Sequence, residues 1–441
     1  MLKAGFVSLG CAKNLVDTEI MLGMLSANNI HLTDNPSDAD IIIVNTCTFI
    51  DSAKEESIST ILQMAEFKKA GNCKSLIVAG CLGQRYKEDL LNELPEVDAI
   101  IGTAAWHRIL EAINLTFKEK RRAIFIDELN TIYDENMPRV TTTPFYSAYV
   151  KVAEGCNNCC SYCVIPKVRG HFRSRTTESI VNEVKELVGR GVREVNLIAQ
   201  DTTSYGRDLY GAPELVALLK KLVTIEDLKW IRLLYCYPKH FTDELIEVIA
   251  AEPKICKYID LPLQHGNNDI LKAMHRQDTR QDIETLLQKI RQRIPGVTLR
   301  TSFIVGFPGE TEAHFEDLKK FVTEQRFDRV GVFTYSQEED TVAANLPNQI
   351  SEETKQERYH DLMSLQCKIS EELNQELEGQ VLDILIEQPT EQANVFVGRS
   401  YREAPDIDGQ IFIENASDCT PGEFIKAKIV QGFTYDLVAE K

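Results

Sequence analysis

Short apolar runs alternate with helical patterns through most of the chain. In the first 115 residues the runs AGFVSLG, ADIIIVN, KSLIVAG and DAIIG are each followed by a segment of helical periodicity. Strands that alternate with helices build parallel sheets covered on both faces, because each crossover helix packs against the sheet. The pattern therefore predicts an α/β domain over residues 1–115, built on a flavodoxin-like parallel sheet.

The alternation resumes after a Thr- and Pro-containing boundary at Thr141–Pro144. Six further strands are expected, with helices between them: SAYVKVA, VNLIAQ, WIRLLY, KYIDLP, TLRTSFIVG and DRVGVFTY. Six βα units are fewer than the eight of a closed barrel, so we expect a partial (β/α)6 barrel over residues 142–372. A long amphipathic helix from about Ser351 to Glu376 is expected to end this domain.

The last part of the chain, residues 374–441, changes character. The runs VLDILIEQ, NVFVGRS, GQIFIEN, EFIKAKIV and TYDLVAE are short and separated by turn residues. Five short strands in so small a space predict a five-stranded, OB-like antiparallel β-barrel.

Charge and composition narrow the possible partners. Lys and Arg total 49 against 67 Asp and Glu, a formal net charge of −18, which argues against a general nucleic-acid surface. No apolar run approaches the ~20 residues of a membrane span, and the N-terminus does not resemble a signal peptide. We therefore expect a cytoplasmic protein with no membrane partner and with its thiols reduced.

Three of the twelve cysteines lie together in EGCNNCCSYC, after the first strand of the second domain. Cys156, Cys160 and Cys163 have a C-x3-C-x2-C spacing, which suits three ligands of a [4Fe-4S] cluster with one iron left open. Active sites of βα barrels lie at this end of the strands. A zinc site usually has a second C-x2-C pair, and none follows here. Cys159 offers an alternative C-x2-C-x3-C set, but only Cys160 gives the spacing with an aromatic residue, Tyr162, before the last cysteine.

A second set of three cysteines follows strands of the first domain. Cys11, Cys47 and Cys81 are 36 and 34 residues apart, each after a predicted strand. Because the carboxyl ends of parallel strands share one edge, the three thiols are expected to converge there and to hold a second cluster with an open iron. The alternative for each is a buried apolar cysteine. The remaining six cysteines show no shared spacing, and we expect no ligand role for them.

The segment RTSFIVGFPGET contains a turn at the end of a predicted strand. Gly306, Pro308, Gly309 and Glu310 would let the backbone approach a bound nucleoside closely. An ordinary strand–helix turn would have a similar sequence.

The chain resembles the methylthiotransferase family of radical SAM enzymes along nearly its whole length. The resemblance rests on the three-cysteine first domain, on CNNCCSYC, and on a C-terminal barrel similar to the TRAM domain. The segments SLGCAKNLVDTE, IPKVRGHFRSR, LPLQHGNNDILKAMHR and GRSYREAPDIDG resemble the RimO type, which modifies an aspartate of ribosomal protein S-twelve. Other members of the family modify adenosine in tRNA.

This resemblance implies two [4Fe-4S] clusters and S-adenosylmethionine as cofactors. We then expect Gly306, Pro308, Gly309, Glu310 and Tyr162 to lie near S-adenosylmethionine. It implies a 5′-deoxyadenosyl radical that takes a hydrogen atom from the β-carbon of the aspartate, followed by transfer of sulfur and a methyl group. An electron donor such as flavodoxin or ferredoxin, and a source of sulfur, are then needed.

The C-terminal segment adds an argument on the substrate that is independent of the resemblance. Residues 378–441 contain 12 acidic and 5 basic residues, a net charge of −7. A barrel that grips RNA should be basic, whereas an acidic one suits a basic protein such as a ribosomal protein. We therefore expect a protein-aspartate methylthiotransferase and regard tRNA as an unlikely partner. The alternatives are a tRNA-adenosine enzyme and a non-enzymatic iron–sulfur RNA-binding module, and the acidic segment could also be merely a solvated surface.

Overall fold

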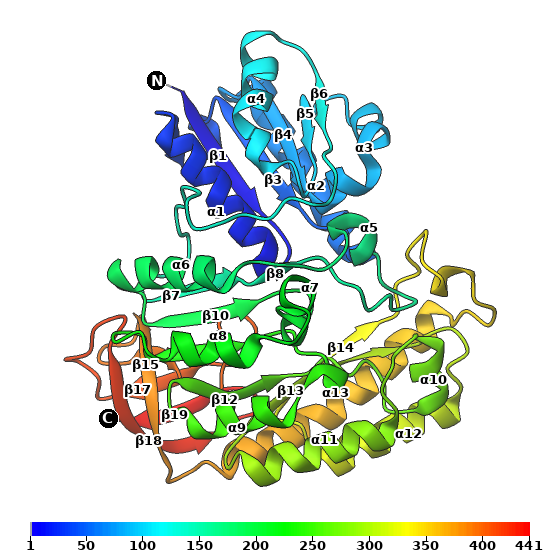
Figure 1. The fold of residues 1–441 in the computed structure, drawn as a ribbon, viewed down its shortest axis with the longest axis vertical. Coiled ribbons are helices and arrows are strands. Elements are labelled where there is room, and N and C mark those ends of the chain that lie inside the picture. The colour runs from blue at the N-terminus through cyan, green and yellow to red at the C-terminus, as the bar shows by residue number, and fades with distance from the viewer. Residues whose placement is uncertain (1) are drawn as a thin grey trace.

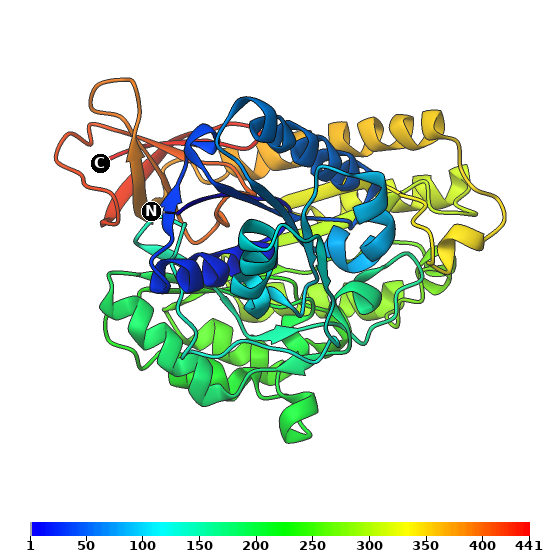
Figure 2. The same cartoon turned by 90° about the horizontal axis from the view of Figure 1, so that it is seen from above.

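The computed structural model describes residues 2–441, which form three parts (Figure 1). An N-terminal α/β domain lies above a central partial barrel, and a small C-terminal β-barrel lies beside the lower part of the central domain. Viewed from above, the N-terminal domain covers part of the central domain (Figure 2). All three expected architectures are therefore present.

The N-terminal domain contains a six-stranded sheet in the order β2-β1-β3-β4-β5-β6, in which every pairing is parallel. Its strands are β1 (Lys3–Ser8), β2 (His31–Thr33), β3 (Ile41–Thr46), β4 (Ser75–Gly80), β5 (Ala99–Ile101) and β6 (Ala123–Phe125). The order of the first five is that of flavodoxin-like folds. β6 follows residue 115 in the chain and extends the same sheet.

Helices cover both faces of this sheet. They are α1 (Ala12–Ala27), α2 (Asp51–Ala70), α3 (Cys81–Glu93) and α4 (Ile109–Ile113). Side chains of α1 and α4 share one apolar cluster with one face, and side chains of α2 and α3 share another with the opposite face. β3 and β4 are buried at every position, which explains their continuous apolar runs in place of an alternating pattern.

The central domain is an open six-stranded parallel sheet in the order β14-β13-β12-β11-β10-β7. All six expected strands form: β7 (Ser147–Lys151), β10 (Glu194–Ile198), β11 (Trp230–Leu233), β12 (Ile255–Asp260), β13 (Thr298–Val305) and β14 (Arg329–Thr334). A small antiparallel hairpin, β8 (Ala153–Glu154) with β9 (Arg173–Ser174), was not expected from the sequence. It brackets the cysteine loop, so the loop and the helix after it are held at the end of β7.

Helices of the central domain fall between the strands, and side-chain caps fix where several of them begin. They are α5 (Ile165–Arg169), α6 (Thr177–Gly189), α7 (Arg207–Tyr210), α8 (Leu215–Leu222), α9 (Asp243–Ala251), α10 (Asn268–Ala273), α11 (Arg280–Arg293), α12 (Glu312–Gln325) and α13 (Glu352–Gln375). Thr279 and Thr311 start α11 and α12 with capping boxes, and the side chain of Ser351 caps α13. Within residues 2–441, no helix combines the length and the apolar character needed to cross a membrane.

The C-terminal domain is a closed five-stranded barrel in the order β15-β16-β17-β19-β18. Its strands are β15 (Val381–Pro389), β16 (Phe396–Arg399), β17 (Ile411–Glu414), β18 (Phe424–Gly432) and β19 (Leu437–Glu440). A buried ion pair fastens it to the central domain, because Glu194 at the start of β10 contacts Arg399 of β16 at 2.8 Å. Arg232 of β11, which also contacts Glu194 at 3.2 Å, donates to the carbonyl of Tyr401 at 2.6 Å. The barrel is thus held at the amino-terminal ends of the central strands, away from the cysteine loop.

The N-terminal and central domains share a continuous apolar cluster. Val16 and Ile20 of α1 belong to the same cluster as Tyr149 of β7 and Trp230 of β11. This packing fixes α1 of the N-terminal domain against the sheet of the central domain.

Candidate active site

The cysteine loop of the central domain connects the hairpin strand β8 to α5. The backbone N–H groups of Asn158 and Ile165 donate to the sulfur atoms of Cys156 and Cys163 at 3.5 and 3.4 Å. Hydrogen bonds of this kind favour the thiolate form, which is the form that binds iron. The loop is further anchored because the hydroxyl of Ser161 donates to the carbonyl of Ala273 at 2.8 Å.

The thiols of this loop lie in a poorly solvated site and influence one another. Burial raises the pKa of Cys156 to about 11, and it also raises the pKa of Cys163, to which the neighbouring Cys160 and Cys156 contribute. Burial therefore disfavours the free thiolate form of these cysteines. A bound metal ion stabilises that form, because the cation takes the place of the proton. The loop therefore fits three ligands of an iron–sulfur cluster.

Cys159 and Cys160 are adjacent but differ in their surroundings. Cys159 is exposed to solvent and has a positive φ of 50°. Cys160 is partly buried, and its proximity contributes, after burial, to raising the pKa of Tyr162. These surroundings support Cys160 as the middle ligand of the loop and leave Cys159 facing outward.

The three N-terminal cysteines each follow a strand at one edge of the N-terminal sheet, as the spacing predicted. Cys11 precedes α1, Cys47 follows β3, and Cys81 is the first residue of α3. Gly10 has a φ of +83°, and a Cβ there would lie 2.8 Å from the Cβ of Cys47. Gly80 has a φ of +90°, and a Cβ there would lie 2.2 Å from Oδ1 of Asn45. Both turns therefore require glycine, and Gly10 brings the Cys11 turn against Cys47.

The surroundings shift the pKa values of these three thiols in different directions. Burial would raise the pKa of Cys11, but the cations of Lys13 and Arg169 and backbone N–H donors outweigh it and lower the pKa. Burial raises the pKa of Cys81 to about 12, with Cys47 and Cys11 adding to it, and burial also raises the pKa of Cys47, with Cys11 adding to it. Cys11 and Cys81 lie at helix N-termini, where the helix dipole favours a thiolate.

Asn14 links the three strand ends, a role that the sequence did not reveal. Its Nδ2 donates to the carbonyl oxygens of Leu9 and Thr46 at 3.1 and 2.8 Å, and its Oδ1 accepts from the thiol of Cys81 at 3.7 Å. One buried amide thus contacts Cys81 and the segments that adjoin Cys11 and Cys47.

No three His, Cys, Asp or Glu side chains among residues 2–441 converge on a point that could hold a single metal ion. A four-iron cluster fits a spread set of thiols, because each cysteine binds a different iron.

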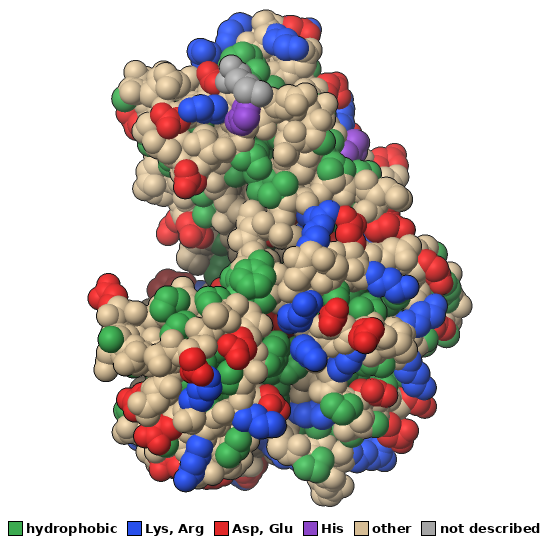
Figure 3. Space-filling view, turned by 90° about the vertical axis from the view of Figure 1, so that its left-hand side faces the viewer, with side chains coloured by type: hydrophobic (Ala, Val, Ile, Leu, Met, Phe, Trp, Pro, Cys, Tyr) green, Lys and Arg blue, Asp and Glu red, His purple; other side chains and the backbone are tan. Residues whose placement is uncertain are grey.

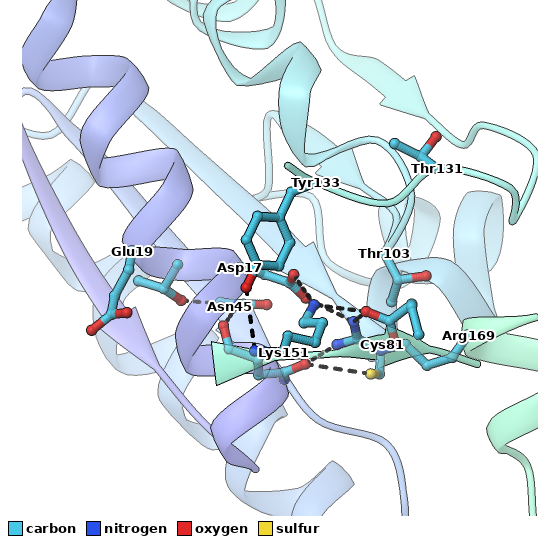
Figure 4. Close-up of polar contacts among 12 residues, drawn as sticks. Asp17, Glu19, Asn45, Cys81, Thr103, Thr131, Tyr133, Lys151 and Arg169 are labelled. Carbon is cyan, nitrogen blue, oxygen red and sulfur yellow. Dashed lines mark hydrogen bonds and ion pairs between the residues drawn. The ribbon is translucent and has the colours of Figure 1, made fainter. Parts of the chain in front are cut away.

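A buried network of charges connects the N-terminal cysteine edge with β7 and with α5, the helix that follows the core cysteine loop (Figure 4). Lys151 of β7 donates to Asp17 of α1 at 2.6 Å and to Glu154 at 2.7 Å. Arg169 of α5 contacts the same two carboxylates at 2.7 and 3.2 Å, and it also donates to Asn14. The only signals in the sequence were a lysine inside the apolar run SAYVKVA and the Arg169 of IPKVRGHFRSR.

The turn at Gly306–Glu310 lies beside the cysteine loop, because Phe307 and Tyr162 belong to the same apolar cluster. Gly306 and Gly309 both have positive φ, as such a turn requires. The carboxylate of Glu310 is 1% exposed; it accepts from the backbone of Gly306 and contacts Arg358 at 2.8 Å. Glu310 thus stabilises the turn by accepting a hydrogen bond from its backbone. It stays a prediction that S-adenosylmethionine is bound by Gly306, Pro308, Gly309, Glu310 and Tyr162.

Comparison with known proteins agrees with this geometry. Residues 3–102, 150–322 and 379–441 match the models of "Uncharacterized protein family UPF0004", "Radical SAM superfamily" and "TRAM domain". Among solved structures, the radical S-adenosylmethionine methyltransferase TsrM from Kitasatospora setae, with cobalamin and a [4Fe-4S] cluster bound, aligns with a TM-score of 0.54. It shares 14% identity over 76% of this chain and 74% of its own, so the likeness shows the fold.

Two relatives named "Ribosomal protein uS12 methylthiotransferase RimO" match almost end to end. The protein from Desulforamulus reducens is 55% identical over 99% of this chain and 98% of its own length. The protein from Geobacter sulfurreducens is 50% identical over the same shares. The fold and the cysteine loop therefore define a radical SAM transferase. More particularly, the chain belongs to the RimO family of methylthiotransferases, which confirms the resemblance seen in the sequence.

Proposed function

We propose that this protein adds a methylthio group to the β-carbon of an aspartate of ribosomal protein uS12. One observation carries the proposal: this chain aligns over 99% of its length with a relative named for methylthiotransfer to ribosomal protein uS12. The non-enzymatic RNA-binding alternative is not supported, because the relatives are enzymes.

The cofactors proposed are S-adenosylmethionine and two [4Fe-4S] clusters. Cys156, Cys160 and Cys163 would hold one cluster, and Cys11, Cys47 and Cys81 the other, each leaving one iron without a protein ligand. Together these groups would supply the one-electron chemistry that an unactivated C–H bond requires and the sulfur that replaces its hydrogen. The chain itself supplies the six thiols, the N–H groups that donate to the sulfur atoms of Cys156 and Cys163, and the apolar packing between the two domains.

The charge of the C-terminal barrel supports a basic protein substrate. Its segment carries a net charge of −7. On the face shown in Figure 3, acidic and basic side chains are interspersed over the lower part of the molecule, where a grip on RNA would favour a basic patch. An electron donor such as flavodoxin or ferredoxin, a sulfur source and a cytoplasmic location complete the proposal.

The substrate is tested by mass spectrometry of uS12 and tRNA from cells that lack this chain. The proposal predicts loss of the methylthio mark from the ribosomal protein, with tRNA unchanged, and recovery on complementation. Complementation with a Cys156→Ala variant should fail, whereas the adjacent Cys159→Ala variant should succeed. Loss of a methylthio mark on tRNA, with uS12 unchanged, would establish the tRNA-adenosine alternative instead.

A further inference from the structure

Helix α5 spans the distance between the two cysteine sites. At its start, the N–H of Ile165 donates to the sulfur of Cys163. At its end, Arg169 reaches into the N-terminal domain and donates to Oδ1 of Asn14, the oxygen that also accepts from the thiol of Cys81. A five-residue helix thus contacts the core triad at its start and reaches Cys81 of the N-terminal triad through Asn14 at its end.

The guanidinium group of Arg169 divides its contacts between carboxylates and the cysteine edge. Nη1 contacts Asp17 at 2.7 Å and Glu154 at 3.2 Å, whereas Nη2 faces Asn14. The residue is only 2% exposed. Lys151 donates to the same two carboxylates, so a second cation shares their negative charge and Arg169 does not have to neutralise them alone.

We propose that Arg169 is a positioning residue for the N-terminal cysteine site, which it fixes against the core loop and supplies with a permanent positive charge. The inference rests on the proposed two-cluster function and deepens it, because it assigns a residue of the radical SAM domain to the chemistry of the other domain.

Two physical arguments support an arginine at this place. Three thiolates and any sulfide bound there concentrate negative charge in a poorly solvated site, where a nearby cation acts strongly. Arginine also stays charged when buried, and its planar fork can hold a carboxylate with one arm and an amide with the other. Lys13, the other nearby cation, directs its ammonium group onto the ring of Tyr235 at 3.1 Å from the centroid.

The test uses the full-length chain with Cys156, Cys160 and Cys163 changed to alanine, so that only the N-terminal site can bind iron. Arg169→Gln and Arg169→Lys are added separately, with Arg190→Gln as the control because Arg190 pairs with Glu186 on the surface. The measurements are iron per chain after anaerobic reconstitution and the midpoint potential from a redox titration followed by EPR.

Removing the charge should disfavour reduction of the cluster. We expect Arg169→Gln to lower the equilibrium constant for reduction at least tenfold, which is about 59 mV for one electron. Arg169→Lys should recover most of that shift, and Arg190→Gln should leave the potential unchanged. A potential that does not move in Arg169→Gln would overturn the inference.

Other outcomes of the same experiment are also decisive. If Arg169→Gln binds no iron but Arg169→Lys does, the iron content, in place of the midpoint potential, shows that the site requires a positive charge at this position, and the inference is supported. If both lose iron equally while Arg190→Gln keeps it, a charge role is overturned. The parent variant lacks Cys156, Cys160 and Cys163 but keeps the N-terminal cysteines. If it binds no iron, the proposed function is wrong about a second cluster, and the inference is overturned with it.

Discussion

The two cysteine triads are assembled in opposite ways. The core triad occupies eight consecutive residues of a single loop, and neighbouring backbone N–H groups contact its sulfur atoms. The N-terminal triad comprises residues 36 and 34 positions apart, which share one edge of the sheet only because three parallel strands end there. The geometry of the core triad depends on one loop, so we call it a local triad. The geometry of the N-terminal triad depends on the whole sheet and on Asn14 and Arg169, so we call it a topological triad. Substitutions remote in sequence should therefore disturb the second far more than the first.

The largest effect is expected from breaking the core triad. Replacement of Cys156, Cys160 and Cys163 by alanine should remove about half of the bound iron, because one of two clusters is lost. It should also abolish formation of 5′-deoxyadenosine from S-adenosylmethionine under reducing conditions. Iron analysis and chromatography of the products check both points. Cys159→Ala is the matched control, since Cys159 faces solvent in the same loop, and an equal loss there would contradict the assignment of ligands.

Breaking the N-terminal triad should separate radical formation from sulfur transfer. Replacement of Cys11, Cys47 and Cys81 by alanine should again remove about half of the iron. It should leave production of 5′-deoxyadenosine intact, because the core loop does not use these residues, and it should abolish the methylthio product on uS12. Unchanged iron per chain would show that these cysteines are not ligands.

A smaller effect should follow from disturbing the turn that leads into Cys81. Gly80→Ala places a Cβ 2.2 Å from Oδ1 of Asn45 at a φ of +90°. We expect a loss in unfolding free energy of about 3 kcal/mol, with reduced iron at the N-terminal site. Gly309→Ala is the control, because its φ of +82° is similar but nothing lies within 4 Å of the new Cβ.

The control should show only the backbone cost of the left-handed region, about 1–2 kcal/mol. Denaturant unfolding of both variants measures the difference, which reports the added cost of the Asn45 contact together with that of the Gly80 backbone conformation (φ 90°, ψ −152°). Equal losses in the two variants would mean that the Asn45 contact relaxes freely and that the edge is less rigid than its hydrogen bonds indicate.

Much of this architecture could be predicted from the sequence, because periodicity and spacing are local signals. All six core strands and the five strands of the C-terminal barrel formed where apolar runs predicted them. The N-terminal cysteines followed their strands because strand ends in a parallel sheet share an edge. The same reasoning extended the N-terminal domain only to residue 115 and did not identify β6, whose run AIF is too short for periodicity to show.

The contacts between domains could not be predicted, because no sequence period connects their members. Lys151 and Asp17 are separated by 134 positions, and each alone has the sequence pattern of an ordinary charged residue. Likewise, Glu338 after β14 is 1% exposed because it pairs with Arg85 of α3 at 2.6 Å. Such charges become interpretable only when packing removes water from both partners. The residues that relate the two triads were therefore the part of the site that sequence reasoning missed.

The smallest effect on either triad is expected from the interface with the C-terminal barrel. Burial alone would raise the pKa of Glu194, but Arg399 and Arg232 outweigh it and lower the pKa to about 2. Since the pKa is lowered on folding, the stabilisation is fully present above the ordinary value of 4.5 and is lost as the pH falls from there towards 2. Stability should thus be flat between pH 7 and 5 and fall below about 4.5.

Glu194→Gln removes this stabilisation at neutral pH and leaves two buried arginines short of a partner, which should cost about 3 kcal/mol in unfolding free energy. Glu186→Gln, which breaks the exposed pair with Arg190, should cost less than about 0.5 kcal/mol. Because Glu194 lies at the far ends of the strands, iron per chain and 5′-deoxyadenosine formation should not change in folded Glu194→Gln protein. Loss of iron from one triad only would show that the C-terminal barrel supports that site through the central sheet. The geometry of that triad would then depend on a third domain as well, and the contrast between a local and a topological triad would have to be redrawn.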